Sequence, residues 1–328
     1  MADSPLNLTQ HIADSPLQKL HGSLLDKANV ELYVKRDDLI HPQFGGNKWR
    51  KLKYNLIHAR ENHFDTLLTF GGAWSNHIYA TAAAGKHFGF NTIGLIRGEP
   101  HSHLNATLSF ARKCGMQLHY VDRVRYRLKN EAAFLNDIKQ QFGNVYILPE
   151  GGSNTLALEG CKEIVQEISS ELNKPFDVIC CASGTGATLA GLALAIETEK
   201  NTLQLPTVEQ RAIGFSALKG GEFLVTEINN FLASRNTDLS INNWHIETGF
   251  HFGGYAKIND ELTRFMQEFQ SRYNIALDAV YTAKMFYGLF ELIKSGTFKP
   301  GTVIVAVHSG GLQGNKGFDL QLTSEQVT

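Results

Sequence analysis

A lysine follows two glycines and an asparagine in the stretch FGGNKWRKLKYN, residues 44–55, at the start of a basic, amphipathic segment. A lysine in a polar loop is normally a solvated charge. An amine that lies beside an aldehyde cofactor, however, can form a covalent bond with it and take part in catalysis. The role of Lys48 therefore depends on whether another part of the chain can hold such a cofactor next to it.

A second stretch, DVICCASGTGATLAGLALAIE (residues 177–197), has the features of a phosphate site. An apolar strand-like run leads into Ser-Gly-Thr-Gly-Ala-Thr and then into a helical pattern. Backbone N–H groups at a helix N-terminus, with hydroxyls nearby and no bulky side chains, bind a phosphate dianion. No Gly-Lys-Ser/Thr follows, and Gly184, Gly186 and Gly191 do not have the GxGxxG spacing. The stretch therefore predicts a phosphate from a cofactor smaller than NAD or ATP.

Pyridoxal phosphate (PLP) would link these two features, because it carries both an aldehyde and a phosphate. Its ring stores the electron pair released when a bond at the substrate Cα breaks. The stretch GGAWSNHIYA adds Ser75, Asn76 and His77 after a strand-like run. The Asn76 amide could hydrogen-bond the ring hydroxyl and Ser75 could act on the substrate. Ser75 also suits a helix N-cap, and the two roles are compatible.

The elements that must position these residues alternate along the chain. Apolar strand-like runs end in glycine clusters at residues 71–72, 151–152, 184–186 and 310–311. Helical patterns follow at residues 50–63, 75–89, 106–115 and 156–168. This alternation predicts an α/β fold with mainly parallel sheets. Ligands of such sheets lie beyond the carboxyl ends of the strands, so we expect the four clusters to line one crevice.

The composition excludes several classes of function. The 328 residues include 31 basic and 32 acidic side chains, so neither nucleic acid nor a membrane surface is an expected partner. The N-terminus lacks the pattern of a secretory signal, and no apolar run approaches the roughly 20 residues that span a bilayer. Four cysteines without CxxC spacing and a solvated HSH run at residues 101–103 give no metal site. We expect a cytoplasmic protein without a metal.

Eight stretches give the chain a strong family resemblance: SPLQKL, VKRDDL, GGNKWRKL, GGAWSNH, PEGGSN, SGTGATLAG, DAVYTAKM and VHSGG. In order and spacing the chain resembles the 1-aminocyclopropane-1-carboxylate deaminase / D-cysteine desulfhydrase family, PLP enzymes of the tryptophan synthase β-like fold (fold type II). The resemblance implies a homodimer of two-domain chains with PLP in the cleft between the domains. Residues 1–50 and 160–328 would form the larger, PLP-binding domain, and residues 51–159 the smaller one.

The resemblance also assigns roles to individual residues. Lys48, Ser75, Tyr255 and Tyr281 would be catalytic, with Lys48 bonded to PLP. The cofactor would also be bound by Asn76, Thr185, Gly186, Ala187, Thr188, Thr282 and Ser309. The substrate would be bound by Trp74, Ser75, Asn76, His77, Tyr255 and Tyr281. Glu150 and residues 151–152 would line the same pocket.

Two positions bear on the reaction. Deaminases of this family have a glutamate and a leucine where this chain has Thr282 and Ser309, whereas desulfhydrases have small hydroxyl residues. A neutral hydroxyl can donate a hydrogen bond to an unprotonated ring nitrogen. A ring in that state withdraws enough charge for the loss of a good leaving group such as thiolate. We therefore expect α,β-elimination from D-cysteine, giving pyruvate, ammonia and sulfide.

Several alternatives remain open. The same scaffold could deaminate 1-aminocyclopropane-1-carboxylate to 2-oxobutyrate and ammonia. It could also act on another D-amino acid or a β-substituted alanine, because Trp74 replaces the usual glutamine, and Ile78 and Tyr79 stand where an arginine is common. A PLP-binding protein without turnover would lack Lys48, Ser75 or the tyrosines, and all of these are present. A metal hydrolase is the least supported alternative, because the histidines form no cluster of metal ligands in the sequence.

Overall fold

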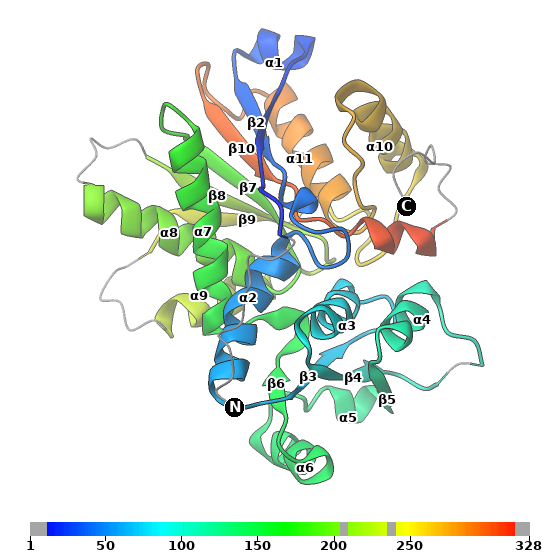
Figure 1. The fold of residues 1–328 in the computed structure, drawn as a ribbon. Coiled ribbons are helices and arrows are strands. Elements are labelled where there is room, and N and C mark those ends of the chain that lie inside the picture. Colours follow the sequence, from blue (N-terminus) through cyan, green and yellow to red (C-terminus); the bar gives the residue numbers. More distant parts are fainter. Residues whose placement is uncertain (1–11, 101, 204–208, 235–240, 319–328) are drawn as a thin grey trace.

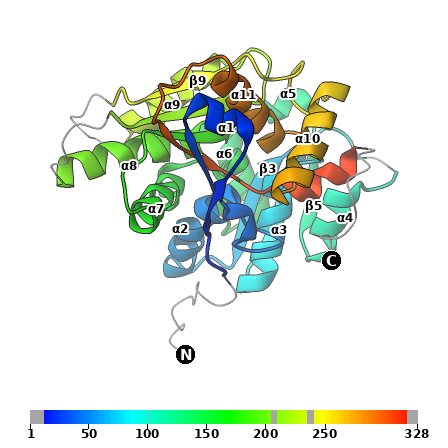
Figure 2. The ribbon, with the colours of Figure 1, turned by 90° about the horizontal axis from the view of Figure 1, so that it is seen from above.

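The protein is described here by a computed structural model covering residues 12–100, 102–203, 209–234 and 241–318. The N-terminal stretch compared with a secretory signal begins outside these residues, and His101 of the HSH run also lies outside them. The chain forms two β-sheets with helices on both faces (Figures 1 and 2). This arrangement confirms the predicted α/β class.

The larger sheet has six strands in the order β1-β2-β10-β7-β8-β9. Only the β1–β2 pair is antiparallel among its pairings. The central strands β7 and β10 are buried along their whole length, as expected for parallel strands covered on both faces. The strands of this sheet are β1 (Leu17–Leu20), β2 (Glu31–Lys35), β7 (Val178–Ser183), β8 (Arg211–Ser216), β9 (Trp244–Glu247) and β10 (Val303–Val307).

The smaller sheet has four parallel strands in the order β5-β4-β3-β6. Its strands come from the middle of the chain and lie low in Figure 1. They are β3 (Thr66–Gly71), β4 (Asn91–Arg97), β5 (Gln117–Val121) and β6 (Tyr146–Leu148). The predicted domain boundaries stay a prediction, and helix α2 (Asn47–Glu61) runs across the first of them.

Helices cover both faces of each sheet. On the larger sheet, α1, α10 and α11 pack on one face and α7, α8 and α9 on the other; on the smaller sheet, α2, α3 and α4 pack on one face and α5 and α6 on the other. The remaining helices are α1 (Ser23–Ala28), α3 (Asn76–Phe88), α4 (Ala106–Lys113), α5 (Arg123–Tyr126), α6 (Ala132–Phe142), α7 (Thr155–Glu171), α8 (Ala187–Leu203), α9 (Phe223–Ala233), α10 (Asp260–Tyr273) and α11 (Thr282–Lys294), with short 3-10 helices η1 (Asp37–Leu39), η2 (Glu150–Gly152) and η3 (Leu312–Gly317).

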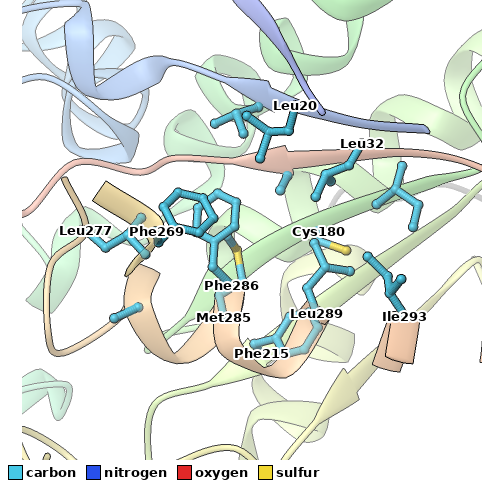
Figure 3. Close-up of a cluster of buried hydrophobic side chains, with 14 of the residues drawn as sticks. Leu20, Leu32, Cys180, Phe215, Phe269, Leu277, Met285, Phe286, Leu289 and Ile293 are labelled. Carbon is cyan, nitrogen blue, oxygen red and sulfur yellow. The ribbon is translucent and has the colours of Figure 1, made fainter. Parts of the chain in front are cut away.

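The core between the larger sheet and α11 shows why these segments pack. Leu32, Cys180 and Phe215 project from three strands toward Phe286 and Leu289 of α11 (Figure 3). All five side chains are buried.

No helix within the described residues is both long and apolar enough to cross a membrane.

Helices α2, α7 and α8 form a tightly packed stack. A Cβ on Gly160 of α7 would lie 1.8 Å from the backbone oxygen of Arg50, and a Cβ on Gly191 of α8 would lie 2.5 Å from the Cβ of Cys161. The Arg50 guanidinium also donates to the Glu167 carboxylate of α7 at 2.7 Å. These close approaches require glycine and tie the helix that carries Lys48 to the larger sheet.

Candidate active site

A cavity of about 2070 Å³ is lined by residues from both sheets at the carboxyl ends of their strands. It brings together most of the side chains that the sequence predicted for the site, although they come from segments far apart in the chain. They are Lys48, Trp74, Ser75, Asn76, His77, Thr185, Gly186, Thr188, Tyr255, Tyr281 and Ser309, with Glu150 and Gly151. Ala187, Thr282 and the second glycine of the predicted pair, Gly152, are not among the lining residues.

The turn before Lys48 depends on a glycine. Gly46 has φ +71°, and a Cβ there would lie 2.0 Å from the backbone oxygen of Ser309. Next to it, the Asn47 N–H donates to the same Ser309 oxygen at 3.3 Å. The first turn of α2 is therefore held directly against the loop that follows β10, and Lys48 is placed beside Ser309.

The Lys48 amine faces the cavity in a setting that disfavours its charge. Loss of water on burial, followed by the charge of Lys51, lowers the pKa of Lys48 to about 7. An ordinary lysine is almost fully protonated at that pH. Much of Lys48 is therefore neutral at physiological pH, the form in which an amine attacks an aldehyde.

The predicted phosphate site lies at the start of α8. Gly186 has φ +82°, which turns the chain into the helix, and the N–H groups of the first helical turn have no partner within the helix. The side chain of Asn47 donates to the Thr188 hydroxyl at 3.2 Å. The residue next to Lys48 thus contacts the phosphate site, although 141 positions separate Asn47 from Thr188.

Lys51, one turn after Lys48, is a site residue that the sequence analysis missed. It is buried, and its ammonium donates to the hydroxyls of Ser153 and Thr185, each at 3.2 Å. Burial lowers its pKa, and Lys51 places a cation at the predicted phosphate site. Helical spacing was the available signal, since positions three apart share a helix face.

The N-terminus of α3 supplies two groups of the cavity. Ser75 is the N-cap, as predicted, and its hydroxyl accepts the Ile78 N–H at 3.3 Å. The Asn76 side-chain oxygen accepts a hydrogen bond from the Gln313 amide of η3 at 2.9 Å. This bond orients the Asn76 amide and leaves its NH₂ group as a donor. Gln313 was not foreseen, because no local pattern marks it.

His77 is buried and hydrogen-bonded through one ring nitrogen only. The Thr69 hydroxyl donates to the Leu148 carbonyl at 3.0 Å, so it accepts from Nε2 of His77 at 2.8 Å. The other nitrogen, Nδ1, has no hydrogen-bond partner within the described part of the chain. Burial, with the charges of Lys48 and Lys51, lowers the pKa of His77 well below its usual value. His77 is therefore neutral, with one acceptor unused.

The two predicted tyrosines meet at the larger sheet. Their ring centroids are 6.1 Å apart, and the Tyr281 ring packs where a Cβ on Gly184 would stand. Burial raises the pKa of Tyr281 well above its usual value, so its hydroxyl keeps its proton and can donate a hydrogen bond. Lys284 holds the loop of Tyr255 in place, donating to the backbone oxygens of His251 at 3.0 Å and Gly254 at 2.7 Å.

Thr282 and Ser309 occupy different settings. Thr282 is fully buried, and its hydroxyl donates to the Asp278 carboxylate at 2.7 Å. That carboxylate also accepts the N–H groups of Val280, Tyr281 and Thr282, which caps α11. Thr282 is thus part of the cap and does not reach the cavity, whereas Ser309 lines it.

The groups present fit PLP. A partly neutral lysine, a helix N-terminus with two threonines and a buried cation, and an oriented amide donor correspond to its aldehyde, phosphate and ring hydroxyl. No cluster of three or more His, Cys, Asp or Glu side chains suited to a metal occurs among the described residues.

Comparison with known proteins agrees with this chemistry. The family model described as "Pyridoxal-phosphate dependent enzyme" matches residues 8–310. A putative 1-aminocyclopropane-1-carboxylate deaminase of Thermotoga maritima is 31% identical, over 92% of this chain and 94% of that protein. A bifunctional D-cysteine desulfhydrase/1-aminocyclopropane-1-carboxylate deaminase of Arabidopsis thaliana is 30% identical, over 87% and 73%. The crystal structure of an ACC deaminase homologue superposes with a TM-score of 0.78 at 29% identity, covering 93% of this chain and 91% of the other.

Proposed function

The chain belongs to the pyridoxal-phosphate dependent enzyme family, and on this premise we propose that it is a lyase that eliminates the β-substituent of a small amino acid. D-cysteine is the first candidate, with pyruvate, ammonia and sulfide as products. The observation that carries the proposal is the meeting, in one cavity, of the partly neutral Lys48 with the N-terminus of α8, Ser75 and the tyrosine pair.

The residues divide the work of binding. The first turn of α8, Thr185, Thr188 and Lys51 would hold the cofactor phosphate through N–H groups, hydroxyls and a buried charge. Asn76, oriented by Gln313, would donate to the ring hydroxyl. When bound, PLP stabilises the negative charge that develops at the substrate Cα.

The same residues also account for the proton transfers. Lys48 would hold the cofactor aldehyde and, as a free amine, would accept the Cα proton at Nζ, which is possible because its pKa is about 7. Ser75 would orient the substrate. Tyr281, which keeps its own proton, would donate a hydrogen bond to the leaving group, and Tyr255 would position that group.

Elimination is favoured over ring opening by the group available for the ring nitrogen. We propose Ser309 as this group, because Ser309 belongs to the cavity lining beside the Lys48 turn while Thr282 is bonded to Asp278. A neutral hydroxyl leaves the nitrogen unprotonated, which suffices for a good leaving group.

Deamination of 1-aminocyclopropane-1-carboxylate is the second candidate, because the Arabidopsis relative carries both activities in its name. Purified protein incubated separately with D-cysteine, L-cysteine and 1-aminocyclopropane-1-carboxylate decides between them. We expect pyruvate and sulfide from D-cysteine, none from the Lys48→Ala variant, and no 2-oxobutyrate. Production of 2-oxobutyrate would establish the second candidate, and no product from any of the three would refute both.

We also propose that the protein is a cytoplasmic homodimer, as the family resemblance implies. Light scattering of the purified protein tests the dimer, and a monomeric mass would refute it. Fractionation of the source cells tests the location.

A further inference from the structure

Arg97 is a cation on the cavity wall that the proposed mechanism does not use. It is the last residue of β4, and since Gly71 of β3 pairs with Ile96, Arg97 lies beside Gly72. Its Nη2 atom is 3.7 Å from the position of a Cβ on Gly72. Gly72 begins the loop that leads to Ser75, and its backbone oxygen accepts the Ser75 N–H at 3.0 Å. The guanidinium thus stands where parallel strands place ligands, next to the loop proposed to bind substrate.

The Arg97 side chain is exposed and lines the cavity. Within the described residues it has no ion pair and no hydrogen bond. Two other cations of the lining are paired: Arg36 with Asp38 at 2.8 Å and Lys129 with Glu150 at 3.3 Å.

Glu150, the carboxylate that could have neutralised Arg97 on this wall, is already held. Besides Lys129, it accepts a hydrogen bond from the Tyr126 hydroxyl at 2.9 Å. The Arg97 guanidinium carbon lies 5.9 Å from the centre of the Tyr126 ring, a packing contact that orients the charge without cancelling it. The planar fork of an unpaired guanidinium favours an oxyanion bound through two parallel hydrogen bonds.

The substrate has room to supply such a group. Arg97 and Ser75 line the same open cavity, so a group on the substrate can reach the guanidinium without a wall between them. The α-carboxylate of the substrate has donors of its own, because the first-turn N–H groups of α3 follow Ser75 directly. A second anionic group is therefore the ligand that Arg97 lacks.

We propose that Arg97 binds an oxyanion on the β-substituent of the substrate, so that amino acids whose β-oxygen is esterified with sulfate or phosphate are substrates in addition to D-cysteine. This inference rests on the proposed elimination and adds its substrate class. With serine O-sulfate, the Cα–H and Cβ–O bonds break, and sulfate leaves with the electron pair of the Cβ–O bond. Water then replaces the amine, and the products are pyruvate, ammonium, sulfate and one proton.

The test compares two substrates that differ in the charge of the leaving group. Serine O-sulfate and β-chloroalanine, each as D and L isomers, are assayed for pyruvate with wild-type protein and with the Arg97→Met, Arg97→Lys and Lys316→Met variants. Lys316 is the matched control, another exposed cation of the lining. We expect Arg97→Met to lower kcat/KM for the sulfate ester about 10- to 100-fold and to change it for β-chloroalanine less than about 3-fold. Arg97→Lys should recover part of the loss, and Lys316→Met should leave both substrates unchanged.

A binding measurement separates recognition from turnover. The inactive Lys48→Ala protein is titrated calorimetrically with and without the additional Arg97→Met change. That change should weaken the binding of serine O-sulfate about 10- to 100-fold and leave the binding of alanine unaffected. An equal loss of affinity for serine O-sulfate and alanine would show that Arg97 binds the α-carboxylate. No loss of affinity would show that Arg97 binds neither the α-carboxylate nor the sulfate group. Either result overturns the inference. Failure of wild-type protein to process either compound would instead refute the proposed elimination.

Discussion

The pKa of Lys48 makes a prediction about how the protein takes up PLP. Attachment of the aldehyde requires the neutral amine. Lowering the pKa from 10.5 to about 7 raises the ratio of neutral to charged amine by roughly 3,000-fold at a given pH between these values. The rate of attachment should therefore rise with pH, reach half its maximum between pH 6 and 8, and then level off. An ordinary lysine would show a rate that still increases at pH 9.

The assay follows the absorbance change when PLP is mixed with PLP-free protein at pH 5.5 to 9.5. Borohydride reduction and mass spectrometry then identify the attachment site, which should be Lys48. The Lys48→Ala variant measures the background from other lysines. A rate that climbs without a plateau through pH 9, with attachment confirmed at Lys48, would refute the argument that burial keeps this amine neutral.

Three further changes test the positioning of the site. Gly46→Ala should lower the unfolding free energy measured in urea by about 1–3 kcal/mol or more and should lower the PLP content. The reason is that φ is +71° and the new Cβ would meet the Ser309 oxygen. Gly98→Ala is the control for backbone strain alone, because Gly98 has φ +106° and no atom within 4 Å of the new Cβ. Burial lowers the pKa of Lys284 to about 8, so the unfolded chain binds the proton more tightly between pH 8 and 10.5. The stability of the wild type relative to Lys284→Met should thus rise across that window by at most about 3 kcal/mol, and a fall in urea titrations would contradict this sign. Thr282→Glu should melt at a lower temperature without gaining 2-oxobutyrate production, because the new carboxylate would face Asp278; a stable, deaminating variant would contradict that placement.

The central strands could be predicted from the sequence because both faces of a parallel sheet are buried. The apolar runs at residues 177–183 and 301–311 contain β7 and β10, and the alternating patterns between residues 65 and 122 contain β3, β4 and β5. Strands β1, β8 and β9 were not singled out. β9 is short and half-buried along its length, so it lacks a clear pattern.

The site was predictable in part for a different reason. Lys48 and the start of α8 each carry a local pattern, and the chemistry of one cofactor joined them before any distance was known. Gln313 and Arg97 carry no such pattern, because their importance comes from neighbours in space, Asn76 and Gly72. Thr282 illustrates the opposite limit: its residue type suited the cavity, but Asp278, four residues earlier, takes its hydroxyl.

The glycine contacts that join α2, α7 and α8 have a consequence for motion. Lys48 and the N-terminus of α8 belong to one stack, whereas Ser75 and Arg97 belong to the smaller sheet. Helix α2 also packs on the smaller sheet, so a movement of that sheet that keeps the aldehyde and phosphate anchors at a fixed distance requires β3 and α3 to slide over α2. Such a movement would open the substrate wall without loosening the cofactor, and mutations at the α2–α3 contact would then change substrate entry while mutations at the α2–α7–α8 contacts would change PLP retention.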